Sequence, residues 1–187
     1  MTESKDYGLR VEDREISLNV PDAVKIIGIF ESTNVLAPTL DKLTFPSGLS
    51  LDTESVIGEK VYGETTGAVA QITSRVSATE IEIVNITSID FAIGETVIFS
   101  ESALQTSLQD ITFGNHLNIT NEFTLDKGQR DQFYDYSRIV RKTNFAAPSR
   151  KLLIVFDKYK VTSNDRGDFY TVDSYAAERY SLSLIHI

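Results

Sequence analysis

Apolar and polar residues alternate with a period of two along several short stretches of this chain. The clearest are Ile16–Val20 and Glu80–Val84, and such alternation is typical of strands with one buried face. After a turn at Pro21 and Asp22, Val24–Phe30 is a second extended run that is rich in β-branched residues. We therefore expect 16–20 and 24–30 to form neighbouring strands.

A different pattern marks Leu152–Phe156, where five apolar residues follow one another. Such a run suits a strand that is covered on both faces, although periodicity alone also allows a short buried helix. The β-branched Ile154 and Val155 favour the strand. A polar turn over 163–168 leads into Phe169–Val172, which we expect to return as the partner strand of a hairpin.

A short sequence motif occurs twice in the middle of the chain. Ile57–Val61 reads IGEKV and Ile93–Val97 reads IGETV, with the two glycines 36 residues apart (94 − 58). Both copies are predicted to be turns that enter strands, because glycine tolerates the positive φ that such turns need. A hairpin that contains Gly63 and Gly67 is expected between them, over 62–70. Two copies are too few for a solenoid, so the pattern predicts a small β-barrel.

Loop and helix signals complete the predicted architecture. Pro38, Pro46 and Gly48 mark a loop-rich join and a module boundary, and helical signals are limited to 100–108 and 174–179, each as a short helix or turn. The predicted fold class is mainly β, with two or three small antiparallel β modules of the sandwich or small-barrel type and few short helices. The expected segments are 1–45, whose strands could join the sheet of the C-terminal module; 46–105, a barrel-like module; and 106–181, the C-terminal β module.

Composition and charge narrow the classes of function. The 187 residues are 41% hydrophobic and 24% charged, with a formal charge of −9 and no cysteine. Residues 123–175 carry ten Lys or Arg against seven Asp or Glu, so the remainder holds eight against twenty. An acidic chain repels nucleic-acid backbones, so no nucleic-acid partner is predicted. The basic excess over 123–175 is either a solvated surface or a face that docks on an acidic neighbour, such as the first half of another copy.

Several other kinds of site lack the residues that they need. The two histidines are His116 and His186. His186 lies in the segment 182–187, which we interpret below as an artefact, and His116 follows a predicted turn at Gly114 and Asn115, which favours a surface or packed histidine over a general base. A zinc site would need more His or Cys ligands than the chain offers. Asp and Glu are too numerous for any pair to indicate a catalytic acid and base. No run approaches the roughly 20 apolar residues of a membrane span, and residues 1–14 are polar. We therefore predict no catalytic residue, metal or cofactor, no membrane span and no secretory signal.

The segment Phe123–Tyr136, FTLDKGQRDQFYDY, is the densest mixture of turn residues, charges and aromatics in the chain. Asp, Lys and Gly at 126–128 predict a turn after a strand. One interpretation is a packed turn that is stapled by aromatic rings and by an Arg–carboxylate pair. The other is a subunit contact, because Tyr and Arg are enriched at interface cores. The candidate interface residues are Arg130, Phe133, Tyr134, Tyr136 and Arg138.

Together with RIVRK (138–142), PSRKLLIVFDKY (148–159) and GDFYTVDSY (167–175), this segment resembles a domain in large virion proteins of tailed phages that infect marine cyanobacteria. The IGE-x-V turns and Gly67–Ala70 resemble modules that recur in phage tail proteins. The resemblance implies a non-enzymatic structural protein of the tail, baseplate or tail fibre, located in the virion and assembled in the host cytoplasm. Its partners would be other virion subunits, and it would be a homo-oligomer in the particle.

Two other functions remain open from the sequence. A receptor-binding module could grip host surface polysaccharide with exposed aromatics such as Tyr134, Tyr136, Tyr159 and Tyr170, because sugar rings stack on such faces. A polysaccharide-degrading enzyme is the third hypothesis, and no constellation of catalytic residues supports it.

The last six residues, Leu182–Ile187, read LSLIHI and resemble the translation of a sequencing-library adapter. We interpret 182–187 as an artefact of a metagenomic fragment and expect the natural polypeptide to continue beyond Ser181. We therefore exclude 182–187 when we predict the fold.

Overall fold

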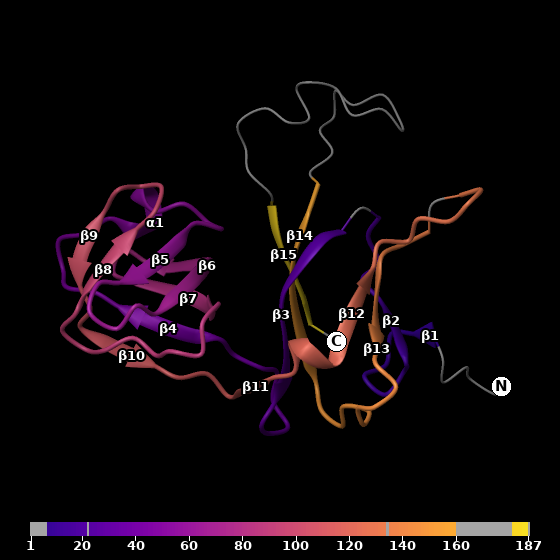
Figure 1. The fold of residues 1–187 in the computed structure, drawn as a ribbon. Helices are drawn as coiled ribbons and strands as arrows, with labels where there is room; N and C mark the ends of the chain where they lie inside the picture. Colours follow the sequence, from indigo (N-terminus) through magenta and orange to yellow (C-terminus); the bar gives the residue numbers. More distant parts are fainter. Residues whose placement is uncertain (1–6, 22, 134, 160–180, 187) are drawn as a thin grey trace. The chain divides into compact units, whose positions relative to one another are not determined.

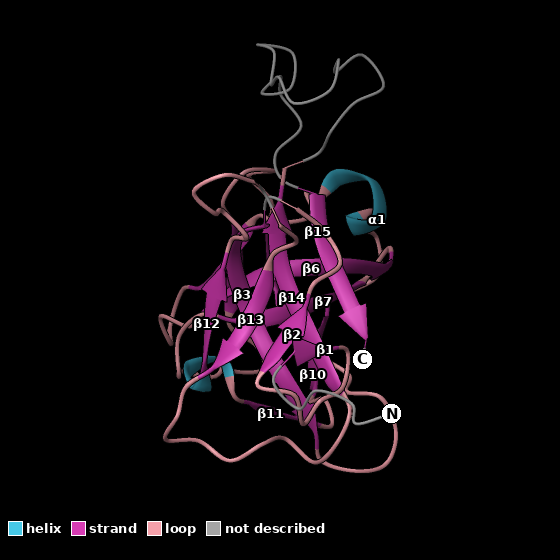
Figure 2. Ribbon diagram, turned by 90° about the vertical axis from the view of Figure 1, so that its right-hand side faces the viewer, coloured by secondary structure: helices cyan, strands magenta, loops and turns pink. Residues whose placement is uncertain are grey.

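The computed structural model describes residues 7–21, 23–133, 135–159 and 181–186. They form a mainly β protein whose strands pair almost entirely antiparallel, which confirms the predicted fold class (Figures 1 and 2). The chain divides into two compact units: unit 1 comprises Met1–Pro38 and His116–Ile187, and unit 2 comprises Thr39–Asn115. In the described part, no helix has the length and apolar character that a membrane crossing requires.

The described residues of unit 1 form two four-stranded sheets. The first has the order β1 (Tyr7–Gly8), β2 (Glu15–Ser17), β13 (Arg138–Arg141), β12 (Phe123–Asp126), and the second has the order β11 (His116–Asn118), β3 (Ala23–Ser32), β14 (Leu152–Lys158), β15 (Ser181–His186). One apolar core draws on both sheets, with Ile16, Phe123 and Ile139 from the first and Ile29 and Ile154 from the second. A shared core between two sheets is the arrangement of a β-sandwich.

The predicted pairing of the N-terminal strands is wrong. Strands β2 and β3 follow one another along the chain, but β2 pairs with β1 and β13, whereas β3 pairs with β11 and β14. The backbone of Asn19 has a positive φ of 58°, a conformation that Asn tolerates better than most residues. Between the two strands, therefore, the chain turns and passes from one sheet to the other.

The apolar run at Leu152–Phe156 forms strand β14, and residues 152–157 are all buried, as expected for a strand that is covered on both faces. Its partners are β3 and β15. The predicted partner, 169–172, lies outside the described residues, as does the possible helix over 174–179. Strand β15 contains residues 182–186 of the adapter-like segment, so this segment takes part in a sheet of the structure.

Unit 2 contains one curled sheet. Its order is β10 (Asp110–Thr112), β4 (Asp41–Thr44), β7 (Glu80–Asn85), β6 (Val69–Ser77), β5 (Lys60–Gly63), β8 (Thr96–Phe99), β9 (Gln105–Ser107). The edge strands β9 and β10 are separated by only Leu108 and Gln109 in the sequence, so the sheet curls round on itself. The predicted barrel-like module was 46–105; unit 2 is longer because β4 and β10 pair with each other and β4 pairs with β7.

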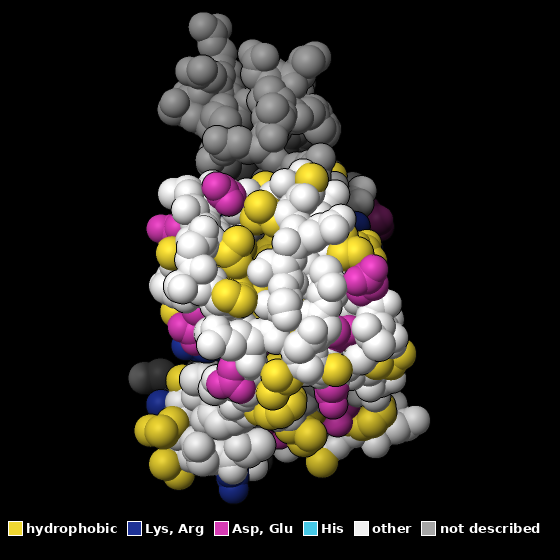
Figure 3. All heavy atoms as spheres, turned by 90° about the vertical axis from the view of Figure 1, so that its left-hand side faces the viewer, with side chains coloured by type: hydrophobic (Ala, Val, Ile, Leu, Met, Phe, Trp, Pro, Cys, Tyr) yellow, Lys and Arg dark blue, Asp and Glu magenta, His cyan; other side chains and the backbone are white. Residues whose placement is uncertain are grey.

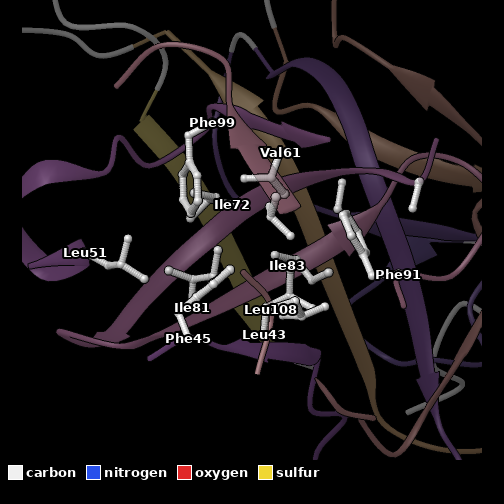
Figure 4. Close-up of a cluster of buried hydrophobic side chains, with 13 residues drawn as sticks. Leu43, Phe45, Leu51, Val61, Ile72, Ile81, Ile83, Phe91, Phe99 and Leu108 are labelled. Atoms are coloured by element: carbon white, nitrogen blue, oxygen red, sulfur yellow. The ribbon is translucent and has the colours of Figure 1, made fainter. Parts of the chain in front are cut away.

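The curled sheet encloses its own apolar core, which Figure 4 shows in close-up. Phe45 and Phe99 pack with their ring centroids 5.7 Å apart, and Leu51 reaches the same core from the short helix α1 (Leu51–Glu54). Burying a side chain of this size contributes about 1.5–3 kcal/mol. Of the segments with helical signals, 100–108 contains a turn followed by strand β9 instead. A 3₁₀ turn, η1, lies at Thr120–Glu122 in unit 1.

The two copies of the repeated motif, Ile57–Val61 and Ile93–Val97, form two similar turns in unit 2, and each turn leads into a strand. Gly58 and Gly94 have φ of 92° and 90°. In the first turn the N–H of Val56 donates to Oε1 of Glu59 at 2.6 Å, and in the second the N–H of Ala92 donates to Oε1 of Glu95 at 2.7 Å. Each buried glutamate therefore closes the turn to which it belongs.

Each glutamate also binds the loop that follows the other copy's strand. Oε2 of Glu95 accepts the N–H groups of Thr65 and Thr66 at 3.2 and 3.0 Å. Oε2 of Glu59 accepts those of Glu101 and Ser102, both at 3.1 Å. The hydroxyls of Thr66 and Ser102 lie within hydrogen-bonding distance of the same carboxylates.

All these equivalent residues are 36 positions apart, and the register of β5 and β8 pairs Tyr62 with Ile98, which are also 36 apart. Unit 2 therefore has an internal pseudo-two-fold axis between Tyr62 and Ile98. The pKa of Glu95 is lowered: burial raises it, but the hydrogen bonds from Ala92, Thr66 and Thr65 together outweigh this effect. Glu95 is accordingly held as a carboxylate.

We predict that Glu95→Gln lowers the free energy of unfolding by about 1–3 kcal/mol, the range for hydrogen bonds to a charged group. The amide nitrogen of Gln would face backbone N–H donors and leave at least one of them without an acceptor. Glu59→Gln should cost a similar amount because of the pseudo-two-fold symmetry. Urea unfolding at pH 7 measures both, with the exposed Glu64→Gln as control, and equal midpoints for Glu95→Gln and Glu64→Gln would contradict the prediction.

Candidate functional site

The candidate interface residues lie on the hairpin formed by β12 and β13 in unit 1. The last pair of its register is Asp126 with Arg138, and residues 127–137 form the connecting loop. Gly128 has a φ of 80° and is buried, and a Cβ atom there would clash with the carbonyl oxygen of Asp135. The N–H of Asp135 donates to the carbonyl of Gly128 at 2.8 Å. The loop therefore folds back closely on itself, and only glycine suits this position.

The base of this loop is tied to the N-terminal part of unit 1. Ser137 is fully buried, and the N–H of Ala23 donates to its hydroxyl at 3.1 Å. The hydroxyl in turn donates to the carbonyl of Lys127 at 3.2 Å. In addition, the N–H of Leu18 donates to the carbonyl of Ser137, and the N–H of Ser137 donates to the carbonyl of Val20. These bonds fix where the hairpin leaves the sheet.

Two arginines and three carboxylates form a charged network at the hairpin. Arg130 binds Asp126 through two hydrogen bonds, at 3.0 Å to Oδ1 and 2.7 Å to Oδ2. Arg138 binds Glu15 at 3.0 Å and also binds Asp135, and its Nε lies 3.7 Å from Oδ2 of Asp126. Bidentate Arg–carboxylate pairs are among the strongest and most directional hydrogen-bonded contacts in proteins. The network therefore holds both strands, the loop and strand β2 together.

The Asp126–Arg130 pair of this network is ionised at neutral pH. Hydrogen bonding from Arg130 lowers the pKa of Asp126; burial opposes this shift, and the N–H of Gly128 and the charges of Arg130 and Arg138 reinforce it. The same bond to Asp126 raises the pKa of Arg130. Arg138 is 9% exposed, so its charge lies among partners rather than in solvent. It cannot be offered to an external ligand without breaking these contacts.

The aromatic residues of the loop lie differently from the arginines. Phe133 is 62% exposed and Tyr136 is 50% exposed, while Tyr134 lies outside the described residues. The structure thus contains the Arg–carboxylate pairing that was expected for a packed turn, but the rings of Phe133 and Tyr136 do not staple that turn. They project from a loop whose backbone is fixed by hydrogen bonds.

Glu15 is the member of this network that sequence reasoning missed. It precedes Arg138 by 123 positions and reaches it because β2 pairs with β13. Its position directly before the predicted strand 16–20 was the available signal, but the partner expected for that strand was 24–30, whereas the structure pairs it with β13. Asp126, Arg130 and Asp135 are close in sequence, and their proximity could be expected.

His116 and Asp157, two further residues that could take part in catalysis or binding, instead contact other side chains of the protein. The ring of His116 packs edge-on against Phe30 with centroids 4.8 Å apart. Asp157 is buried, which raises its pKa, and it is paired with Lys25 at 3.3 Å, which opposes the shift. Within the described part of the chain, no three His, Asp or Glu residues are grouped as a metal site would require.

We predict that Arg138→Ala lowers the free energy of unfolding by about 1–3 kcal/mol. Removing one partner of a fully buried ion pair costs about 3–5 kcal/mol, and this figure is reduced here because the side chains of Glu15 and Asp135 are each 35% exposed. Arg130→Ala, at the more exposed end of the network, should cost less than Arg138→Ala. Chemical unfolding measures the free energy of unfolding of both variants. A larger decrease for Arg130→Ala than for Arg138→Ala would contradict the prediction.

A second prediction concerns pH. Because the folded protein lowers the pKa of Asp126, its contribution to stability is complete above the ordinary Asp pKa of about 4 and disappears as the pH falls through the lowered pKa. Asp126→Asn should therefore weaken the loss of stability on acidification below about pH 4. Thermal unfolding from pH 7 to 2 measures it, with the exposed Asp131→Asn as control. An unchanged pH profile in Asp126→Asn would refute the assignment.

The chain was compared with models of protein families, with curated proteins and with solved structures. None of the three comparisons gives a match.

Proposed function

We propose that this chain is a non-enzymatic structural component of a phage tail, baseplate or tail fibre, which acts by binding other virion subunits. The class of virion is inferred from the sequence over 123–175, which resembles a domain of such proteins. Binding rather than catalysis is inferred from the β12–β13 hairpin. On this proposal the protein resides in the virion and is assembled there with its partners.

The observation that carries the proposed binding role is the pair of exposed rings, Phe133 and Tyr136, on a loop held by the buried Arg138 and its partly exposed carboxylate partners. An aromatic ring supplies a large apolar contact area. When the backbone beneath it is already fixed, less conformational entropy is lost on binding. Large aromatic side chains on rigid supports are therefore suited to be the anchors of a protein–protein contact.

The way in which unit 2 is joined to unit 1 supports the same role. The chain leaves β3 and returns at β11, where His116 pairs with Ser32. At the ends of unit 2, Oδ1 of Asn115 accepts the N–H and the hydroxyl of Thr39 at 2.6 and 2.7 Å, and the N–H of Asn115 donates to the hydroxyl of Thr39 at 3.1 Å. Unit 2 is thus an inserted module with its two ends clasped, which extends the surface that the protein offers to partners.

Host polysaccharide is the second candidate ligand, because exposed rings also bind sugars. Tyr136 is 50% exposed and Tyr159 is 41% exposed, whereas Tyr134 and Tyr170 lie outside the described residues. Polysaccharide binding that persists in high salt and disappears in Tyr136→Ala would favour this candidate over subunit binding.

If the hairpin is a subunit contact, Phe133→Ala should fold normally but lose at least roughly tenfold in incorporation into virions, as expected for an interface anchor worth more than about 1.4 kcal/mol. Phe113→Ala is the matched control: Phe113 is 65% exposed, close to the 62% of Phe133, but lies in unit 2. Quantitative mass spectrometry of purified particles measures incorporation relative to tail proteins.

Equal incorporation of Phe133→Ala and the wild type into virions would show that the hairpin is not part of the subunit contact. Finding the wild-type protein only in infected-cell lysate, and never in purified virions, would defeat the proposal as a whole.

A further inference from the structure

Unit 1 contains an open groove of about 460 Å³ in the described residues. One wall comes from the link between β1 and β2, with Leu9, Arg10 and Glu12, and the other from Val35, after β3, and from Arg150 and Lys151, before β14. Leu9 is 59% exposed and Val35 is 86% exposed. Three cationic side chains and one carboxylate thus line a groove that also presents apolar surface to solvent.

The walls of this groove are fixed by hydrogen bonds. Oε1 of Glu31 accepts the N–H groups of Ser149 and Arg150 at 2.7 and 2.9 Å, and the guanidinium of Arg150 donates to the carbonyl of Thr33. On the opposite side, Oδ2 of the buried Asp13 accepts the N–H of Arg10 at 3.1 Å. The groove is therefore formed before any partner arrives, which reduces the entropic cost of binding.

Unit 2 carries the complementary charge. Its 77 residues, 39–115, include eleven Asp or Glu and three Lys or Arg. Unit 1 contains sixteen Asp or Glu and fifteen Lys or Arg. Figure 3 shows a face of the molecule on which acidic side chains surround apolar patches and few basic ones are visible. Complementary charge of this kind steers association and selects partners.

The outer face of the unit 2 sheet also carries an apolar row. Val61, Val97 and Ala70 point into the core, so their neighbours Tyr62, Ile98 and Val69 point outward. The register places Tyr62 opposite both Ile98 and Val69. The exposed Glu64 follows Tyr62 by two residues, at the start of the turn after β5, where its N–H donates to the carbonyl of Thr96 at 2.9 Å.

From these complementary features we propose that the groove of unit 1 binds the outer face of unit 2 in a second copy of the chain. The apolar row around Tyr62 packs on Leu9 and Val35, and Glu64 pairs with Lys151. This inference rests on the proposed subunit-binding role and names one partner for it. Because groove and face are different surfaces, the contact is heterologous, and repeated copies form a ring or a filament.

The test is the association state of the full chain by sedimentation velocity, over 1–200 μM protein in low and high salt. We expect association in roughly 50 mM salt and dissociation in roughly 500 mM, because exposed charge pairs are screened. Lys151→Glu should weaken association at least roughly tenfold, and Glu64→Lys should do the same. Lys158→Glu, an equal charge change on unit 1 at the opposite end of β14 from the groove, is the control and should associate like the wild type.

The charge swap identifies the partner surface. Lys151→Glu and Glu64→Lys should each remain dissociated alone but associate when mixed, because each groove then meets a face of opposite charge. Circular dichroism establishes that every variant is folded. A wild type that stays monomeric in low salt, a Lys151→Glu variant that associates normally, or a mixture that stays dissociated would each overturn the inference.

This outcome is separate from that of the virion experiment. Self-association through the groove can fail while the Phe133 contact in the particle persists, in which case only the second-copy contact is withdrawn. Conversely, self-association combined with absence from purified virions would leave the groove contact standing and remove the phage assignment.

Discussion

The pairing of strand β3 with strands from the far end of the chain is the constraint on which the rest of the structure depends. β3 bonds to β14 along nearly its whole length and to β11 at its end. These contacts bring residues 23–32 beside residues 116–118 and 152–158, so unit 1 cannot form until the chain on both sides of unit 2 is present. The core between its two sheets, the groove walls and the base of the β12–β13 hairpin all follow from this closure.

Local patterns predicted those features whose causes are local. The uninterrupted apolar run at Leu152–Phe156 identified β14, and the repeated Ile-Gly-Glu turns identified the entries to β5 and β8. Positive φ at Gly58 and Gly94 is a requirement of the turn itself, so it can be recognised in the sequence. The cluster of Asp126, Arg130 and Asp135 within ten residues likewise allowed an Arg–carboxylate pair to be expected.

The features that were missed depend on contacts between distant segments. Alternation at Ile16–Val20 indicates a strand but not its partner, so β2 was assigned beside β3 although it pairs with β13. For the same reason Glu15 could not be assigned to Arg138. The exposure of Phe133 and Tyr136 was also hidden, because an aromatic side chain in a turn suits a packed loop and a binding surface equally well. Only the bonds of Gly128, Ser137 and Arg138 show that the loop is fixed without the rings of Phe133 and Tyr136.

An acidic chain must stabilise its buried and half-buried carboxylates against desolvation, and this protein does so in two different ways. In unit 1, guanidinium groups neutralise the charges of Asp126, Asp135 and Glu15. In unit 2, Glu59 and Glu95 are held by backbone N–H groups and hydroxyls with few cations available. Backbone donors are present whatever the side chain, which leaves the surface of unit 2 acidic and the surface of unit 1 nearly balanced.

The reciprocal glutamates have a consequence for the ancestry and folding of unit 2. Each half supplies the carboxylate that completes a loop of the other half, so neither half is satisfied alone. A peptide that carried one half would leave its own glutamate without the distant N–H donors and its own loop without an acceptor. Two such peptides could satisfy each other, because the internal dyad relates equivalent positions. A single curled sheet of this design is what fusion of two interlocking copies of a shorter ancestor would produce.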